Sequence, residues 1–141
     1  MGILFKIFGG IQVWLYRVSG GKLGGKMAGF KVLLLTTVGR KSGKIHTVPL
    51  GFFERQGGYL IVASKGGAPS NPAWYYNLKD QPQVTVQIYE MVMPASVEVL
   101  SGEARAQAWQ QVISEAPSYA AYEKRTTREI PLILLRPVKK G

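Results

Sequence analysis

The sequence of 141 residues contains no cysteine and a single histidine, His46. Without cysteine the chain has no disulfide, no thiolate nucleophile, no Cys-ligated zinc and no iron–sulfur cluster. One imidazole cannot build a His-rich metal site, and a Ser-His-Asp triad would depend on that single ring. Paired carboxylates at an acid–base spacing are absent, which argues against a glycosidase. We therefore predict no metal site and assign no catalytic role to His46.

Acidic residues are scarce, with eight Asp and Glu against eighteen Lys and Arg, for a formal net charge of +10. The first acidic residue is Glu54, and every charged residue before it is basic: Lys6, Arg17, Lys22, Lys26, Lys31, Arg40, Lys41 and Lys44. A surface of one sign attracts anions such as nucleic acid, an acidic membrane surface, or a phosphorylated or polycarboxylated small molecule. Charge alone does not separate these partners from simple solubility.

Long apolar runs are absent too, since no stretch reaches the ~20 apolar residues that cross a bilayer. The first part of the chain carries a helical apolar stripe: Leu4, Ile7, Phe8, Ile11, Trp14, Leu15 and Val18. This stripe, followed by the basic and glycine-rich residues 20–26, fits an interfacial membrane helix. It fits a helix packed on the domain equally well, because periodicity does not distinguish lipid from core.

The length and the 46% apolar content fit one globular domain. We divide the chain into an N-terminal segment, residues 1–30, and a domain, residues 31–141. Runs of strand-forming residues predict strands at 32–37, 45–53, 59–63, 84–89, 92–100 and 130–136. Helices are expected from Pro72, over about 103–114 with Ser101 as N-cap, and from Pro117. These elements predict a mainly β fold with accessory helices (α+β), an antiparallel barrel of about six strands.

Four segments carry residues suited to ligand binding. The turn at 40–44 holds three cations and a hydroxyl, which suits a phosphate or carboxylate, or is an ordinary solvated turn. In the loop at 64–67, Lys65 adds a cation and two glycines permit close backbone approach to a ligand, or simply positive φ. Residues 71–78 combine a helix start with aromatics. Tyr119 and Tyr122 share one helical face, to stack on a ligand or to pack as a lid.

The order of these motifs resembles that of a known family. The run Leu33 to Gly43 (LLLTTVGRKSG), Pro49-Leu50, Ala63 to Gly67 (ASKGG), Pro72 to Leu78 (PAWYYNL), Pro117-Ser118-Tyr119 and Ile130-Pro131 follow each other as in the deazaflavin-dependent nitroreductase family. The quinone reductases that use coenzyme F420 are of this kind. The resemblance covers the chain from about Lys31 to its end.

The resemblance implies a split β-barrel, similar to FMN-binding proteins, that binds F420, a deazaflavin with a phosphate and a polyglutamate tail. Arg40, Lys41 and Ser42 would hold the phosphate or tail, Ser64 and Tyr119 would lie by the reacting face, and Tyr122 would close over the substrate. Those three are the implied catalytic residues. The implied cofactor-binding residues are Arg40, Lys41, Ser42, His46, Thr47, Val48, Pro49, Leu50, Gly51, Val62, Ala63, Ser64, Lys65, Ala73, Trp74, Tyr75, Tyr76, Asn77 and Tyr119.

The implied reaction is hydride transfer from the reduced deazaflavin to a quinone, an activated alkene or a nitroaromatic. Tyr119 or Ser64 would donate the proton or orient the acceptor. Ala116 stands where the family's substrate lid carries a tyrosine, which puts reduction of nitroimidazoles in question. With a lipophilic quinone as acceptor, residues 1–26 would make peripheral membrane contact, and the protein would be cytoplasmic, on the inner face of the cell membrane.

Other readings of the same residues predict different behaviour. An FMN-binding or haem-handling split barrel would keep the fold and change the cofactor, and a non-catalytic carrier would bind F420 without turnover. A nucleic-acid-binding barrel would interleave exposed aromatics with cations on its strands. Here the cations cluster in turns, so we expect no nucleic acid partner. We expect a monomer or a weak dimer.

Overall fold

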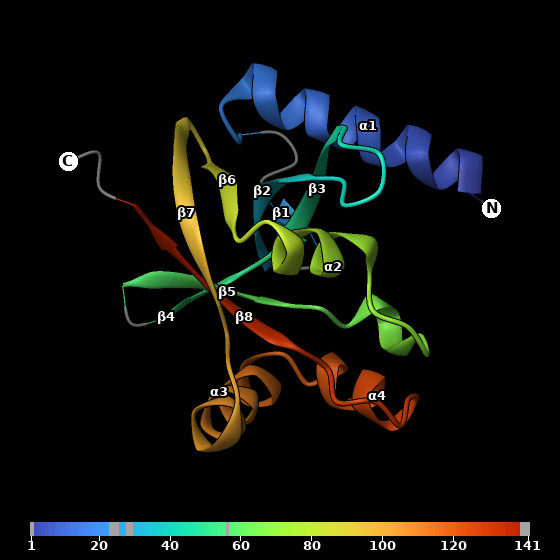
Figure 1. The fold of residues 1–141 in the computed structure, drawn as a ribbon, viewed down its shortest axis with the longest axis vertical. Coiled ribbons are helices and arrows are strands. Elements are labelled where there is room, and N and C mark those ends of the chain that lie inside the picture. The colour runs from blue at the N-terminus through green and yellow to red at the C-terminus, as the bar shows by residue number, and fades with distance from the viewer. Residues whose placement is uncertain (1, 23–25, 28–29, 56, 139–141) are drawn as a thin grey trace.

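The computed structural model describes residues 2–22, 26–27, 30–55 and 57–138 (Figure 1). Its helices are α1 (Gly2–Ser19), α2 (Ala73–Asp80), α3 (Gly102–Glu115), α4 (Ser118–Lys124) and the short 3-10 helix η1 (Lys65–Gly67). Its strands are β1 (Lys26–Met27), β2 (Phe30–Val38), β3 (Ile45–Gly51), β4 (Phe53–Arg55), β5 (Gly58–Val62), β6 (Gln83–Ile88), β7 (Met91–Val99) and β8 (Leu132–Pro137).

All pairings in the sheet are antiparallel, in the order β1-β2-β6-β7-β8-β5-β4, and β3 also pairs with β2. The sheet curls into a half-barrel, with α1 at one end of the molecule and α3 and α4 at the other (Figure 1). The predicted antiparallel barrel with accessory helices is therefore confirmed.

The strand predicted over residues 45–53 was wrong in one respect, because the chain breaks at Phe52 into β3 and β4. The Phe52 amide leaves the ladder and donates to the Lys31 carbonyl at 3.0 Å, while its ring enters the main core. β3 then pairs with β2, and β4 pairs with β5 at the far end of the strand order. The break transfers the chain from one edge of the half-barrel to the other.

The central strands are apolar on both faces because both faces are covered. Along β2, Leu33 and Leu35 enter the main core, whereas Val32 and Leu34 pack against α1. In β5 and β8, Ile61 and Ile133 face the main core, and their neighbours form a second cluster with α3 and α4. Side chains alternate between the two faces of a strand, so two covered faces require an unbroken apolar run.

Helix α1 packs on the outer face of β2 through Val13 and Tyr16, both buried with Val32 and Leu34. The Tyr16 hydroxyl donates to the Gln87 carbonyl at 3.3 Å and accepts from the Tyr89 amide at 2.7 Å. Burial raises the pKa of this phenol, so it ionises only at a higher pH than free tyrosine. The packing against the domain expected as one alternative is thus present in the described part of α1.

The packed face of α1 is not the apolar stripe that the sequence indicates. Ile11, Trp14 and Val18 are 49%, 62% and 62% exposed. The side chains of Leu4, Ile7 and Phe8, which share the predicted stripe, lie outside those that the structure describes. Among the described residues, no helix is long and apolar enough to cross a membrane.

The starts of α2 and α3 differ slightly from expectation. Pro72 is the extended N-cap residue of α2 rather than its first helical residue. Ser101 is the N-cap residue of α3 as predicted, but its side chain makes no capping hydrogen bond. The short helix expected after Pro117 is α4, and it carries Tyr119 and Tyr122.

Candidate functional site

A cavity of about 630 Å³ lies where the turn after β2, the start of β3, the loop after β5 and α2 meet. This volume is in the range of small-molecule and cofactor sites. The cavity is lined by Gly39, Arg40, Lys41, Ser42, His46, Val48, Lys65, Ser70, Asn71, Ala73, Trp74, Tyr76 and Asn77. We call it the basic pocket.

The turn at 39–44 forms the cationic side of the basic pocket. The Gly39 amide donates to the Lys44 carbonyl at 2.7 Å, and the Gly43 amide donates to the Gly39 carbonyl at 2.8 Å. A Cβ on Gly39 would lie 2.7 Å from Ser42 Oγ and 2.9 Å from His46 Nε2, so a side chain here would displace both of these pocket residues. Glycine at 39 therefore lets the turn fold tightly against His46.

Asn77, on α2, holds this turn through two hydrogen bonds. Its buried side chain accepts a hydrogen bond from the Arg40 amide at 3.1 Å and donates to the Thr37 hydroxyl at 3.3 Å. The Arg40 guanidinium lies over the Tyr76 ring, 5.0 Å from its centroid, which adds a cation–π contact. Asn77 thus supports the turn through its side-chain amide, whose oxygen and nitrogen both make hydrogen bonds within the protein.

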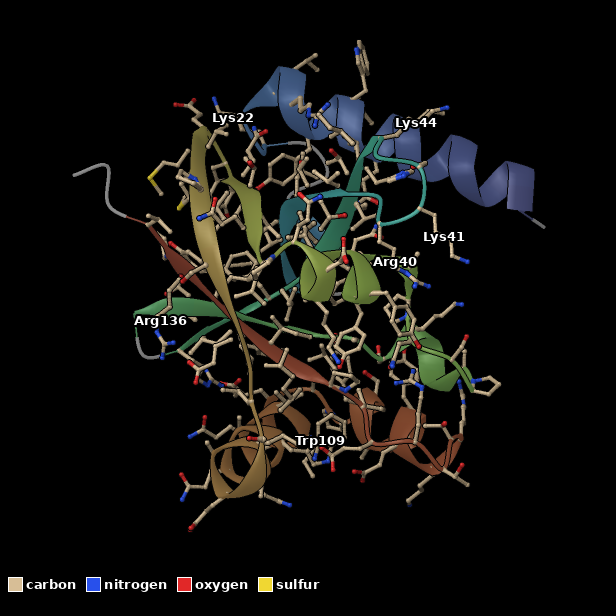
Figure 2. The ribbon with its side chains drawn as sticks, in the orientation of Figure 1. Lys22, Arg40, Lys41, Lys44, Trp109 and Arg136 are labelled. Atoms are coloured by element: carbon tan, nitrogen blue, oxygen red, sulfur yellow. The ribbon has the colours of Figure 1, made fainter. Side chains whose placement is uncertain are left out.

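No acidic residue lines the basic pocket, whereas Arg40, Lys41 and Lys65 do. Figure 2 shows Arg40 and Lys41 on the same side of the molecule, next to α2. The ion pairs found in the described residues join Arg55 to Glu115, Arg105 to Glu129 and Arg136 to Glu98. The charges of the pocket cations are therefore not neutralised by those pairs, and the pocket favours an anion.

The loop after β5 forms the opposite wall. Lys65, Gly66 and Gly67 have φ of 47°, 63° and 82° in succession, a conformation that favours glycine. A Cβ on Gly67 would lie 2.7 Å from the Tyr122 carbonyl oxygen of α4. Gly67 thus approaches α4 closely, whereas a Cβ on Gly66 would meet nothing within 4 Å, so the close approach to a ligand expected at this glycine pair stays a prediction. Lys65 Nζ donates to Ser70 Oγ at 3.4 Å within the loop.

Many of the predicted cofactor residues meet in the basic pocket. These are Arg40, Lys41, Ser42, His46, Val48, Lys65, Ala73, Trp74, Tyr76 and Asn77. Three lining residues were missed: Gly39, Ser70 and Asn71. Asn71 lies in the segment 71–78 and Gly39 in the run Leu33 to Gly43, both of which the sequence already singles out, and that membership was the signal available.

Other predicted residues do not line the cavity. The alternation along β3 explains part of this, because the Thr47 hydroxyl contacts Thr36 and Arg17 on the α1 side. Pro49 shares that side, and Leu50 packs on the main core. Ala63 and Tyr75 belong to the main core and Val62 to the second cluster. Gly51 and Ser64 also stand outside the lining.

Tyr119 and Tyr122 pack in the second cluster, next to α3, and do not line the basic pocket. Their rings meet edge to face with centroids 5.6 Å apart, and Tyr119 also meets Phe53 at 6.2 Å. Burial, with a smaller effect of Tyr122, raises the pKa of Tyr119. The phenol is therefore a weaker acid than free tyrosine. Ala116, in the predicted substrate lid, is buried in the same cluster.

Comparisons with known proteins agree with one another. The family model described as F420H(2)-dependent quinone reductase matches residues 10–137. A protein named F420H(2)-dependent quinone reductase from Mycobacterium tuberculosis is 35% identical over 126 residues, which cover 86% of this chain and 84% of that one.

Solved structures are similar as well. One titled as an F420-H2 dependent reductase (FDR-A) has 42% identity and a TM-score of 0.67, and covers 74% of this chain and 93% of that one. Another, titled as a domain-swapped dimer, has 36% identity and a TM-score of 0.71 over 89% of this chain and 92% of that one. The predicted resemblance is confirmed: the chain belongs to the F420H(2)-dependent quinone reductase family.

Proposed function

We propose that this protein is an oxidoreductase that binds coenzyme F420 in the basic pocket and reduces a quinone with it. The observation that carries the proposal is the absence of Asp and Glu from a cavity of cofactor size that three cations line. The names of the relatives, and the family model that matches almost the whole described chain, point to the same cofactor.

The residues of the pocket fit the chemistry of F420. Its phosphate and glutamate tail are anions, and Arg40, Lys41 and the Ser42 hydroxyl would hold them with charge-assisted hydrogen bonds. Val48, Ala73 and Trp74 give the same cavity an apolar surface suited to a deazaflavin ring. Lys65 adds a cation on the opposite wall.

When bound and reduced, F420 supplies the hydride, which leaves binding and orientation to the protein. Arg40 and Lys41 would fix the anionic end, so that the ring is held in one orientation against the α2 wall. Lys65 Nζ and Ser70 Oγ, 3.4 Å apart, are two donors of the loop wall. Ser64, next to Lys65, stays a candidate for orienting the acceptor.

Tyr119 and Tyr122 have a narrower proposed role than the sequence indicates. Tyr119 does not line the pocket, and its raised pKa makes its phenol a weaker proton donor than free tyrosine. We assign the pair to the acceptor side, as the aromatic surface of α4, and not to proton donation. Replacing Tyr119 would then change the acceptor's KM more than the affinity for F420.

We further propose that the N-terminal segment, residues 1–30, brings the enzyme to a membrane that carries its lipophilic quinone. Support comes from Ile11, Trp14 and Val18, which are exposed at helical spacing on α1 while Val13 and Tyr16 hold the helix to the sheet. Figure 2 shows Lys22 and Lys44 at the α1 end of the molecule, where cations would meet anionic lipid.

Vesicle binding tests this membrane contact. Trp14→Glu should reduce co-sedimentation with anionic phosphatidylglycerol vesicles about tenfold, since it removes the largest exposed apolar side chain of α1. Val99→Glu, at a position 38% exposed at the α3 end of β7, is the control and should bind like the native chain. An equal loss of vesicle binding in both variants would show that the added negative charge weakens binding wherever it is placed, and that α1 is not a docking face.

Turnover tests the reductase itself. F420H2 oxidation is followed by its absorbance in the presence of a soluble menaquinone analogue, and FMNH2 serves as the alternative donor. We expect saturable oxidation of F420H2 that depends on the quinone. Binding without turnover would indicate a carrier, and preference for FMNH2 would indicate a flavoenzyme.

A further inference from the structure

Arg128, in the segment between α4 and β8, lies directly behind the loop wall of the basic pocket. Its Nε donates to the Ala68 carbonyl at 2.9 Å, and its Nη2 donates to the Ser64 carbonyl at 2.7 Å. Its Nη1 donates to the Ala63 carbonyl at 3.2 Å and to Asn71 Oδ1 at 2.6 Å. One guanidinium thus binds four residues of a single loop.

All four acceptors are neutral, and none of the ion pairs in the described residues involves Arg128. The contact is therefore not a salt bridge that any cation could replace. A guanidinium presents its donors in a fixed plane, whereas a lysine ammonium is a point charge with three rotatable donors. Only arginine can reach acceptors spread over residues 63–71 from one side.

Arg128 is connected to the lining of the basic pocket through Asn71. Because Oδ1 of Asn71 accepts from Arg128, its Nδ2 is turned toward the Tyr76 hydroxyl, 3.4 Å away. Tyr76 in turn carries the Arg40 guanidinium over its ring. A continuous chain of contacts therefore joins Arg128 to the cationic turn on the opposite wall.

The same loop includes the backbone that most needs support. Lys65 adopts a φ of 47°, which is unfavourable for a residue with a side chain. Arg125 adds a long hydrogen bond to the Gly66 carbonyl at 3.4 Å, with its guanidinium on the Tyr122 ring. Of the two arginines, Arg128 makes the shorter and more numerous bonds, and it holds the backbone on both sides of Lys65, at Ser64 and at Ala68.

We propose that Arg128 is a positioning residue: it fixes the loop at 63–71 so that Lys65 and Asn71 face bound F420 as a preformed wall. The inference rests on the proposed function, because it assumes that F420 occupies the basic pocket. A loop that must be ordered at binding costs affinity, whereas a preformed one does not. Arg128 touches neither the cofactor nor the substrate and acts through Lys65 and Asn71.

The test compares Arg128→Lys with Arg55→Lys. Arg55 is a matched control, because it also donates to a backbone carbonyl, that of Glu54, and to side chains of α3, far from the pocket on β4. Four values are measured in each variant. They are the rate of amide hydrogen exchange in residues 64–71, the Kd for F420, the KM for F420H2 and kcat.

We expect Arg128→Lys to speed exchange in the loop at least tenfold and to raise Kd and KM about tenfold, with kcat changed less than threefold. Arg55→Lys should leave all four values unchanged. A fall in Tm with native exchange and native Kd would show a merely structural arginine and would overturn the proposal. Native values throughout would overturn it as well.

Asn71→Ala keeps the test decisive if Arg128→Lys does not fold. It removes one acceptor and leaves the three carbonyl bonds, so exchange and Kd should change in the same direction by about threefold, and no change would refute the positioning role. A native chain that binds no F420 overturns the proposed function and the cofactor part of this inference. Protection of residues 64–71 still reports whether Arg128 holds the loop.

Discussion

Asn77→Ala is the substitution whose effect the structure specifies most fully. The buried Asn77 amide makes two hydrogen bonds, from the Arg40 amide and to the Thr37 hydroxyl. Each is worth about 1 kcal/mol net, and a buried group left without a partner costs about 1–3 kcal/mol. We expect the free energy of unfolding to fall by about 2–3 kcal/mol, and Tm to fall by roughly 6–10 °C for a chain of this size.

The same change should weaken cofactor binding, because the Arg40 backbone is no longer tied to α2. We expect the Kd for F420 to rise about tenfold, since the turn must then be ordered at binding. Val112→Ala is the control: this side chain is fully buried in the second cluster, away from the pocket. It should cost about 2 kcal/mol of stability through lost burial and leave Kd unchanged.

Thermal unfolding and a fluorescence titration with F420 separate the two effects. If Asn77→Ala loses stability to the same degree as Val112→Ala and keeps its native Kd, Asn77 is structural only. If it loses no stability, the two hydrogen bonds contribute nothing and the reasoning fails at its first step.

Three further predictions follow from the described side chains. Lys41→Ala should raise the Kd for F420 several-fold and flatten its salt dependence, while Lys44→Ala, an equal charge change outside the pocket lining, should do neither in the same titration. The pKa values of Tyr16 and Tyr119 are raised in the folded state, so above about pH 10 the unfolded state loses these two protons first. The free energy of unfolding, measured by urea denaturation, should therefore fall above about pH 10. It should fall less in Tyr16→Phe. Tyr119→Phe should keep the native Kd for F420. A tenfold higher Kd would show that Tyr119 contributes to the cofactor site.

The fold was largely predictable because covered strands leave a strong sequence pattern. The runs around Leu33, Ile61 and Ile133 are apolar on both faces, and the turns between them are rich in glycine. The break at Phe52 has only one weak signal, Gly51, because the aromatic residues that follow favour a strand, and the pairing of β4 with β5 reveals it. The sequence also does not show which face of α1 packs on the sheet, because both faces carry apolar residues.

The parts of the candidate site that consist of short sequence segments were predictable from their residue types. The parts that depend on contacts between distant segments were not. The basic turn and the aromatic helix carry their own signals, and both line the pocket. The prediction that residues 46–51 all line the cofactor ignores the alternation of a strand, which turns the Thr47 side chain away from that of His46. Arg128 had no signal at all, since three of its four acceptors are backbone carbonyls more than fifty residues away.

The measurement that tests the central claim most directly is a fluorescence titration of the native chain and of Lys41→Ala with oxidised F420, with FMN in parallel. The account predicts saturable binding of F420 by the native chain at micromolar or lower concentration, clearly weaker binding by Lys41→Ala, and weaker binding of FMN, which lacks the glutamate tail. Failure of the native chain to bind F420, or equal affinity of both chains for it, would contradict the assignment of the basic pocket.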